Sequence, residues 1–194
     1  MQDMGATELI LIRHAPALRG GRLCGRTDVA ADLGDLARQA AVVDKAGRPA
    51  RLVVSPALRC RQTAAALWPD RTHDVDPRLW EQDFGAWDGC AYGDLPDLGA
   101  LPADRLAHHQ PPGGESFADV CARTGPALND IAGSGPAVIV AHAGTVRAAL
   151  ALALGHIPAA LAFDVAPLSV TRLMLLGSGQ WMIGCVNWQA TVPT

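Results

Sequence analysis

Two histidines and two arginines stand at positions where they could form one anion site that contains imidazole rings. Arg13 and His14 follow one short apolar run. Arg59 lies shortly after a second run, and His142 ends a third. A guanidinium is planar, permanently charged and suited to phosphate oxygens, whereas a neutral imidazole can attack phosphorus and form a covalent intermediate. These residue types predict phosphoryl transfer in which Arg13, Arg59 and His142 hold the phosphoryl charge without a metal.

Displacement at phosphorus also requires a proton donor for the leaving oxygen. Glu81, Asp83 and Asp88 lie close together in one segment, and the second histidine could serve as well. The residues alone leave this choice open. A single histidine or arginine at such a position is more often structural, so the prediction depends on the whole pattern.

These side chains need a sheet that brings them together. Short apolar runs predict buried parallel strands at residues 8–12, 51–54 and 137–141. Helices are expected at residues 36–45, 57–67, 115–131 and 144–154, and a final hairpin of strands at 169–176 and 180–186. The alternation predicts an α/β fold, a three-layer α/β/α sandwich with a mostly parallel mixed sheet. Ligands of such sheets bind beyond the carboxyl ends of the strands, where the candidate residues fall.

Two connecting segments stand out. Residues 75–112 read as a long irregular excursion with one helical piece, and loops of that length in a compact domain are usually functional. Ser55 is predicted to cap the helix that follows it, with Pro56 at the first helical position.

Bulk properties narrow the function. The length of 194 residues fits one domain spanning 1–194, and the net charge of −3 argues against a nucleic-acid partner. Five cysteines without a CxxC pair suggest free thiols in the cytoplasm. Residues 1–8 do not resemble a signal peptide, and the apolar stretch 148–163 is interrupted, so no membrane partner is expected. A monomer or homodimer acting on a small phosphorylated metabolite is expected.

The motifs, in their order along the chain, resemble those of the histidine phosphatase superfamily, which contains the cofactor-dependent phosphoglycerate mutases and many small phosphatases. The matching segments are LIRH at 11–14, SPALRCRQTA at 55–64, LWEQDFGAWDG at 79–89, PGGES at 112–116 and VIVAHAG at 138–144. The resemblance spans nearly the whole chain, and it implies a phosphoglycerate mutase-like fold.

The resemblance also implies roles for the residues. His14 would be the nucleophile, with Arg13, Arg59 and His142 around the phosphoryl group. Glu81 would be the general acid and later the base that activates water, in preference to its acidic neighbours. No cofactor and no metal are expected.

The loop after the nucleophile departs from the family pattern. The family usually has glycine, threonine and asparagine where this chain has Ala15, Ala17 and Gly20. Arginines of the same loop could compensate for the lost polar groups; they are Arg19, Arg22 and Arg26. The substrate contacts expected here and beside the second histidine are Cys24, Gly25, Arg26 and Ala143.

Several functions stay open at this stage. The short segment between Gly89 and Gly113 favours a phosphatase over a mutase, which typically has an insertion there. Arg105, His108 and His109 are the basic residues in it. A metal site at the two histidines and a non-catalytic binding module are weaker alternatives. Among specific substrates, the resemblance ranks α-ribazole 5′-phosphate first.

Overall fold

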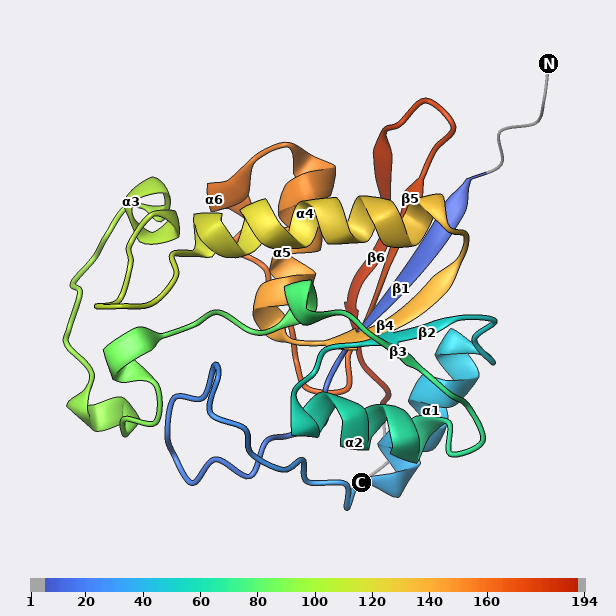
Figure 1. The fold of residues 1–194 in the computed structure, drawn as a ribbon, viewed down its shortest axis with the longest axis horizontal. Helices are drawn as coiled ribbons and strands as arrows, with labels where there is room; N and C mark the ends of the chain where they lie inside the picture. Colours follow the sequence, from blue (N-terminus) through green and yellow to red (C-terminus); the bar gives the residue numbers. More distant parts are fainter. Residues whose placement is uncertain (1–5, 192–194) are drawn as a thin grey trace.

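A six-stranded mixed sheet forms the centre of the computed structural model, which describes residues 6–191 (Figure 1). The strand order is β3-β2-β4-β1-β5-β6. The strands are β1 (Thr7–Arg13), β2 (Leu52–Val54), β3 (Asp74–Val75), β4 (Ala137–Ala141), β5 (Val170–Leu175) and β6 (Trp181–Trp188). The strands β1 to β4 pair in parallel, whereas β5 is antiparallel to β1 and β6 to β5. The mostly parallel mixed sheet and its final hairpin are therefore confirmed.

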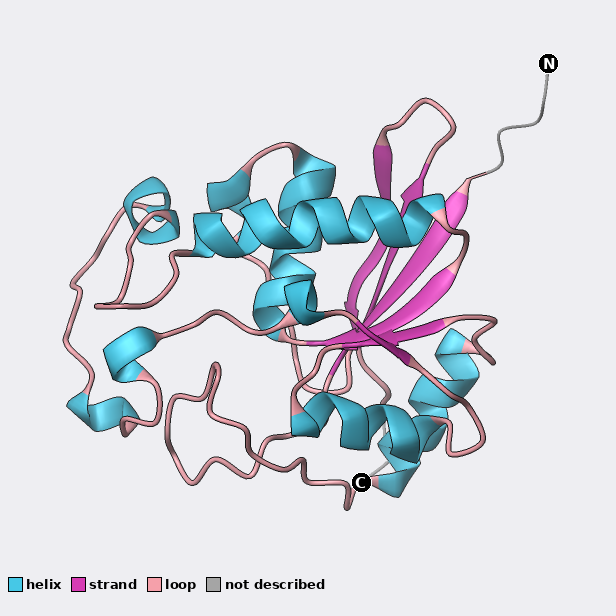
Figure 2. Ribbon diagram, viewed as in Figure 1, coloured by secondary structure: helices cyan, strands magenta, loops and turns pink. Residues whose placement is uncertain are grey.

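Helices cover both faces of this sheet (Figure 2). The α-helices are α1 (Leu36–Ala46), α2 (Leu58–Leu67), α3 (Ala103–Ala107), α4 (Phe117–Gly133), α5 (Ala143–Leu154) and α6 (Ile157–Ala160). Three 3₁₀ turns are η1 (Pro77–Leu79), η2 (Gly85–Trp87) and η3 (Tyr92–Asp94). In Figure 1, α1 and α2 lie on one side of the sheet and α4 and α5 on the other, which gives the three predicted layers.

Alternating side chains of the central strand divide the core into two halves. Leu9 and Leu11 of β1 pack in one cluster with residues of α4 and α5. Ile10 and Ile12 pack in the other cluster with residues of α1 and α2. Because successive side chains of a strand point to opposite faces, an uninterrupted apolar run fits a strand covered on both sides.

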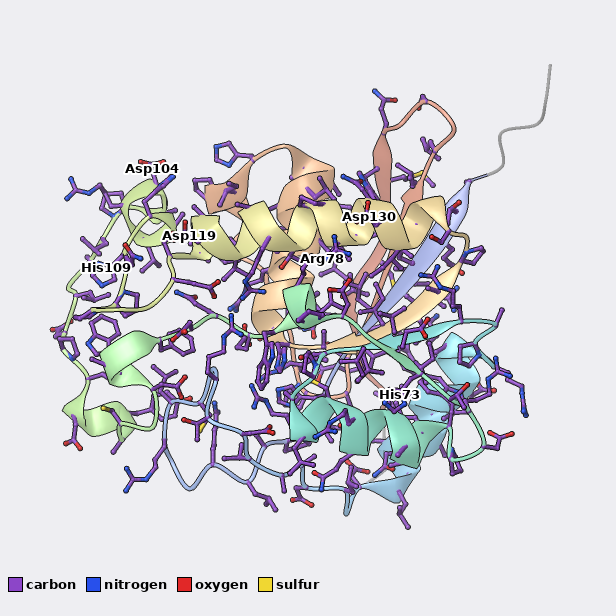
Figure 3. The ribbon with its side chains drawn as sticks, viewed as in Figure 1. His73, Arg78, Asp104, His109, Asp119 and Asp130 are labelled. Atoms are coloured by element: carbon purple, nitrogen blue, oxygen red, sulfur yellow. The ribbon has the colours of Figure 1, made fainter. Side chains whose placement is uncertain are left out.

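Helix α4 begins with a capping box. The Ser116 hydroxyl accepts from the Asp119 amide at 3.1 Å, and the Asp119 carboxylate accepts from the Ser116 amide at 2.9 Å. At the other end of this helix, Asp130 pairs with Arg78 of η1 at 2.7 Å (Figure 3). The pair of Arg78 and Asp130 connects the segment that precedes Glu81 to α4.

The prediction that Ser55 caps a helix was wrong. Helix α2 begins at Leu58, and its N-cap Ala57 offers no side-chain hydrogen bond. The Ser55 hydroxyl lies 2.7 Å from Nε2 of His142, and its oxygen also accepts from the Ala57 amide at 3.4 Å, in the turn before the helix. Ser55 therefore bonds to the buried His142 ring and to the turn that precedes α2, rather than to the first turn of the helix.

The excursion 75–112 contains more structure than the single helical piece predicted for it. It holds η1, η2, η3 and the short α3. Two further elements were missed, the two-residue strand β3 and the four-residue helix α6. Elements this short contain no full period of apolar residues, so their sequence provides no pattern to recognise. Among residues 6–191, no helix has the length and apolar character that a membrane span requires.

Candidate active site

The carboxyl ends of three neighbouring parallel strands bring the predicted residues together. The His14 amide after β1 donates to Ala141 O of β4 at 2.9 Å, and the Ser55 amide after β2 donates to Val140 O at 3.0 Å. The rings of His14 and His142 meet edge to face with centroids 5.2 Å apart. A cavity of about 130 Å³ lies at this edge, and its lining residues are Arg13, His14, Pro16, Ala17, Arg19, Cys24, Arg59, Glu81 and Pro167.

His14 is buried, with 5% of its surface exposed, and its ring is held in one tautomer. Nδ1 lies 2.6 Å from Ala15 O. A carbonyl can only accept, so Nδ1 carries the hydrogen and Nε2 keeps a free lone pair. Burial, followed by the charges of Arg59, Arg13 and Arg19, lowers the pKa of His14 to about 3, although the bond to Ala15 O opposes this shift. The imidazole is therefore neutral and nucleophilic near pH 7 in the ligand-free protein.

Two arginines of the cavity are fixed by backbone carbonyls. The Arg59 guanidinium, 1% exposed, donates to Gly25 O at 2.8 Å and to Thr27 O at 3.2 Å. Arg13 donates through Nη1 to Val165 O. Burial, the largest influence, lowers the pKa of Arg13, but an arginine stays charged in proteins. Their carbonyl partners neutralise no charge, which leaves two positive charges beside His14.

His142 lies behind the cavity in full burial. Its Nε2 is 2.7 Å from Ser55 Oγ and 3.5 Å from Cys60 Sγ, and the Trp80 ring stacks on it with centroids 6.3 Å apart. Burial, with added repulsion from His14 and Arg59, lowers the pKa of His142 well below its ordinary value. The second histidine is thus a neutral ring packed against His14.

Glu81 is the carboxylate that lines the cavity, and the start of α5 holds it. The Gly144 amide donates to Glu81 Oε1 at 3.1 Å, and the Gln82 amide donates to the same oxygen at 3.0 Å. A Cβ at Gly144 would lie 2.1 Å from this Oε1, so the carboxylate occupies space that only glycine leaves free.

The other two acid candidates have different partners. Asp88 accepts from the amides of Arg26 at 2.6 Å and Thr27 at 3.2 Å, and from the Thr27 hydroxyl at 2.6 Å. It thereby fixes the turn whose carbonyls hold Arg59. Asp83 accepts from the Gly85 amide at 2.8 Å. Neither carboxylate lines the cavity.

The expected substrate contacts divide into two groups. Cys24 lines the cavity, and burial raises the pKa of its thiol. Gly25, Arg26 and Ala143 do not line it. The Arg26 guanidinium lies over the Trp80 ring, 5.4 Å from its centroid, and 3.7 Å from a Glu115 oxygen. Gly25 contributes a carbonyl to Arg59, and Ala143 is the first residue of α5.

Sequence reasoning missed the residue that supports Glu81 from behind. Arg123 of α4 donates to the carbonyls of Trp80 at 2.8 Å and Glu81 at 3.0 Å. It also binds Glu115, with 2.8 Å between Nε and Oε1. Burial opposes this ionisation, but Arg123 holds the pKa of the Glu115 carboxyl below its ordinary value. Arg123 follows no strand and belongs to none of the recognised motifs, so nothing in the sequence marked it.

Thr63 was missed as well, although it lies inside the SPALRCRQTA motif. Its hydroxyl accepts from the Ala15 amide at 3.0 Å and donates to Arg59 O at 2.7 Å. It therefore links the backbone beside the nucleophile to α2. The motif was the signal that could have identified it.

The two histidines weighed as a metal site have other contacts. His108 Nδ1 donates to Asp104 O at 2.9 Å, and the His109 ring stacks on Trp87 with centroids 5.4 Å apart. Figure 3 shows His109 and Asp104 near α3. No group of three or more potential side-chain metal ligands occurs within residues 6–191.

The family model of the histidine phosphatase superfamily (branch 1) matches residues 9–189. The chain therefore belongs to this superfamily. It is a histidine phosphatase, a class of enzyme that hydrolyses phosphoric monoesters.

Curated relatives and solved structures support this assignment. The chain is 34% identical over 175 residues to the glucosyl-3-phosphoglycerate phosphatase of Mycolicibacterium vanbaalenii, covering 78% of this chain and 76% of that protein. The solved structure titled mycobacterial hydrolase 1 superposes with a TM-score of 0.84 at 27% identity, covering 96% of this chain and 100% of the other. The α-ribazole phosphatase of Shigella flexneri superposes with a TM-score of 0.79 at 19% identity, covering 96% and 99%, and this likeness shows the fold alone.

Proposed function

We propose that the protein hydrolyses the phosphate monoester of a small metabolite through a phosphohistidine at His14. The observation that carries this proposal is the bond from Nδ1 of His14 to Ala15 O. Because Nδ1 carries the hydrogen, Nε2 of His14 keeps a free lone pair. His14 lines one cavity together with Arg13, Arg59 and Glu81. A nucleophile, two cations and a carboxyl group in one cavity suit phosphoryl transfer in two displacements.

In the first displacement, Nε2 of His14 attacks phosphorus and the bond from phosphorus to the ester oxygen breaks. Protonated Glu81 gives its proton to the departing alkoxide, which leaves as the alcohol. Arg13 and Arg59 bind the equatorial phosphoryl oxygens, whose charge the imidazole alone cannot compensate.

In the second displacement, Glu81 removes a proton from water as the oxygen of that water attacks phosphorus. The bond from phosphorus to Nε2 then breaks, and inorganic phosphate leaves. Glu81 is protonated again and His14 is neutral, so the enzyme returns to its starting state. His142 lies behind the cavity and packs against the His14 ring as a neutral group, so it supports the nucleophile rather than lining the cavity.

For the substrate, the relatives favour a phosphorylated glycerate derivative over α-ribazole 5′-phosphate. The mycobacterial relatives at 34% identity are named glucosyl-3-phosphoglycerate phosphatases. The α-ribazole phosphatase structures are 19% identical. We therefore rank an ester of the first kind ahead of the one that the sequence resemblance favoured.

Phosphoglycerate mutase-type transfer is the second candidate, because it uses the same phosphohistidine. The segment between Gly89 and Gly113 is short, and the two histidines in it have protein partners. This arrangement favours release of the phosphoryl group to water. A non-catalytic binding module is the weakest candidate, because nucleophile, cations and acid all lie at one cavity.

A substrate panel with EDTA present tests these candidates. It contains glucosyl-3-phosphoglycerate, 3-phosphoglycerate, α-ribazole 5′-phosphate, sugar phosphates, phosphohistidine peptides and p-nitrophenyl phosphate. We expect inorganic phosphate to be released, and fastest from the glycerate derivatives. Formation of 2-phosphoglycerate without release of phosphate would favour the mutase, and failure to turn over any ester would favour the binding module. Activity that EDTA removes would contradict a metal-independent reaction.

A further inference from the structure

Arg19 is a third arginine of the catalytic cavity, and the proposed mechanism does not use it. It lines the cavity with His14, Cys24 and Glu81. Its guanidinium lies over the ring of Tyr92, 5.1 Å from the centroid, and its Nη1 donates to the Tyr92 hydroxyl. Stacking and a hydrogen bond to one phenol hold the fork of an otherwise flexible side chain in place.

The other two arginines of the same loop, Arg22 and Arg26, contact groups of the protein itself. Arg22 donates to Gly89 O at 2.8 Å and does not line the cavity. Arg26 lies over Trp80, 3.7 Å from a Glu115 oxygen. Arg19, by contrast, forms no ion pair with any carboxylate of the described chain. Its partner Tyr92 is uncharged, so the positive charge of Arg19 is available to a ligand.

Arg19 is more exposed than the two arginines that bind the phosphoryl group. Arg59 is 1% exposed and Arg13 is partly buried, whereas Arg19 lies at the exposed rim. The cavity of about 130 Å³ is small beside the roughly 300–1,000 Å³ typical of pockets that enclose a whole ligand. A phosphoryl group in contact with the inner arginines would occupy the buried end of the cavity, so the alcohol part of the ester would extend toward the exposed rim.

Glu81 also lines the cavity, and it is uncharged when it carries the proton that the first displacement requires. The three arginines then exceed the charge of a bound phosphate monoester by one positive charge. Arg13 and Arg59 match the two negative charges of a bound phosphate monoester. Arg19 then contributes a third positive charge at the rim, and a carboxylate provides the single negative charge that complements it. Planar guanidinium and planar carboxylate also match in hydrogen-bond geometry.

We propose that Arg19, positioned by Tyr92, binds a carboxylate on the alcohol part of the substrate and so selects acidic phosphate esters. The inference rests on the proposed phosphatase function. It places the selectivity in the loop that follows the nucleophile, where the chain departs from the family pattern.

The test compares two esters of one three-carbon skeleton. In 3-phosphoglycerate a carboxylate stands where glycerol 3-phosphate has a hydroxymethyl group, and both are esters of a primary alcohol. The ratio of kcat/KM for the two is measured in the wild type and in Arg19→Gln, Tyr92→Phe and Arg22→Gln. The last variant removes a neighbouring arginine that does not line the cavity and is the matched control. p-Nitrophenyl phosphate turnover by each variant checks that the phosphatase reaction survives.

We expect the wild type to prefer 3-phosphoglycerate and Arg19→Gln to reduce the ratio by about tenfold, the size of one charge-assisted hydrogen bond. Tyr92→Phe keeps the ring but removes the hydroxyl, so it should reduce the ratio less, chiefly through KM. Arg22→Gln should keep the wild-type ratio.

Two results would overturn the inference while the phosphatase function stands. One is a wild type that hydrolyses both esters equally well, and the other is an Arg19→Gln variant that loses the same factor on both. The second result would assign Arg19 to the phosphoryl group or to general attraction of anions. Absence of p-nitrophenyl phosphate hydrolysis in the wild type would overturn the proposed function and this inference together.

Discussion

At the scale of single residues, the site depends on what each polar group is bonded to. Three carboxylates lie close together in the sequence, and their hydrogen bonds separate them. Asp88 accepts from the Arg26 amide and Asp83 from the Gly85 amide, so each fixes a turn of the backbone. Glu81 lies at the cavity. The resemblance selected Glu81, and the geometry supports that choice for a physical reason that sequence spacing could not provide. Hydrogen-bond partners depend on loops that meet only in the folded chain.

Glu81→Gln tests the role of this carboxyl group by the leaving group of the substrate. General acid catalysis contributes roughly 10²- to 10⁴-fold, and an alkoxide needs the proton far more than a nitrophenolate does. We therefore expect kcat to fall by about that factor on alkyl phosphates and much less on p-nitrophenyl phosphate. Steady-state kinetics on both esters is the measurement. Equal losses on the two would show that Glu81 is not the proton donor.

The buried histidines predict how stability depends on pH. The pKa of His14 is lowered to about 3 and that of His142 well below its ordinary value of 6.5, chiefly by burial. Below about pH 6.5 the unfolded chain takes up protons that the native protein does not, so stability is lost as the pH falls. Each such histidine contributes a slope of about 1.4 kcal/mol per pH unit.

Urea unfolding of the ligand-free protein between pH 7 and pH 5 measures that slope. We expect His14→Gln to reduce the slope by the contribution of one buried histidine, about 1.4 kcal/mol per pH unit. His108→Gln removes an exposed histidine, so this matched control should keep the wild-type slope. A slope in His14→Gln as steep as in the wild type would contradict a neutral, buried His14.

At the scale of elements, the sequence predicted the strands that position the site but not the short 3₁₀ turns of the segment that carries Glu81. β1, β2 and β4 carry long or uninterrupted apolar runs, and their boundaries differ from the prediction by at most one residue at either end. The segment after β3 contains 3₁₀ turns whose form depends on contacts with the loop that follows His14. In one of these contacts the Leu23 amide donates to Cys90 O at 2.9 Å. Contacts between distant segments leave no periodic pattern in either one.

The start of α5 provides a prediction at this scale. In Gly144→Ala the new methyl group would meet Glu81 Oε1 at 2.1 Å, so the carboxylate must move away from Gly144 and leave its present position. We expect kcat/KM on alkyl phosphates to fall about 10- to 100-fold, since small displacements of a catalytic group are costly. Helix α5 itself should persist, because alanine favours a helix more than glycine does.

Gly125→Ala is the matched control for that substitution. Gly125 also lies in a helix, and its added Cβ would meet no atom within 4 Å beyond its chain neighbours and the backbone of its own helix, so the variant should keep its activity. Unchanged activity of Gly144→Ala on alkyl phosphates would contradict the placement of Glu81.

At the scale of the whole molecule, one sheet holds both halves of the core together. Neighbouring residues of β1 and β4 enter opposite clusters, so neither cluster can exist without the same strands. We therefore predict one cooperative thermal transition, in which the calorimetric and van't Hoff enthalpies agree. Two resolved transitions would contradict a single domain. The expected cytoplasmic location and the choice between monomer and homodimer stay predictions from the sequence.

The central claim is the phosphohistidine at His14, and rapid-quench trapping of phosphate label from a radiolabelled ester tests it most directly. We predict label on the wild-type protein that is stable in base, labile in acid and mapped to the peptide containing His14. His14→Ala should carry none while it keeps the circular dichroism of the wild type. Label that remains in His14→Ala, or that maps to another residue in the wild type, would contradict the account.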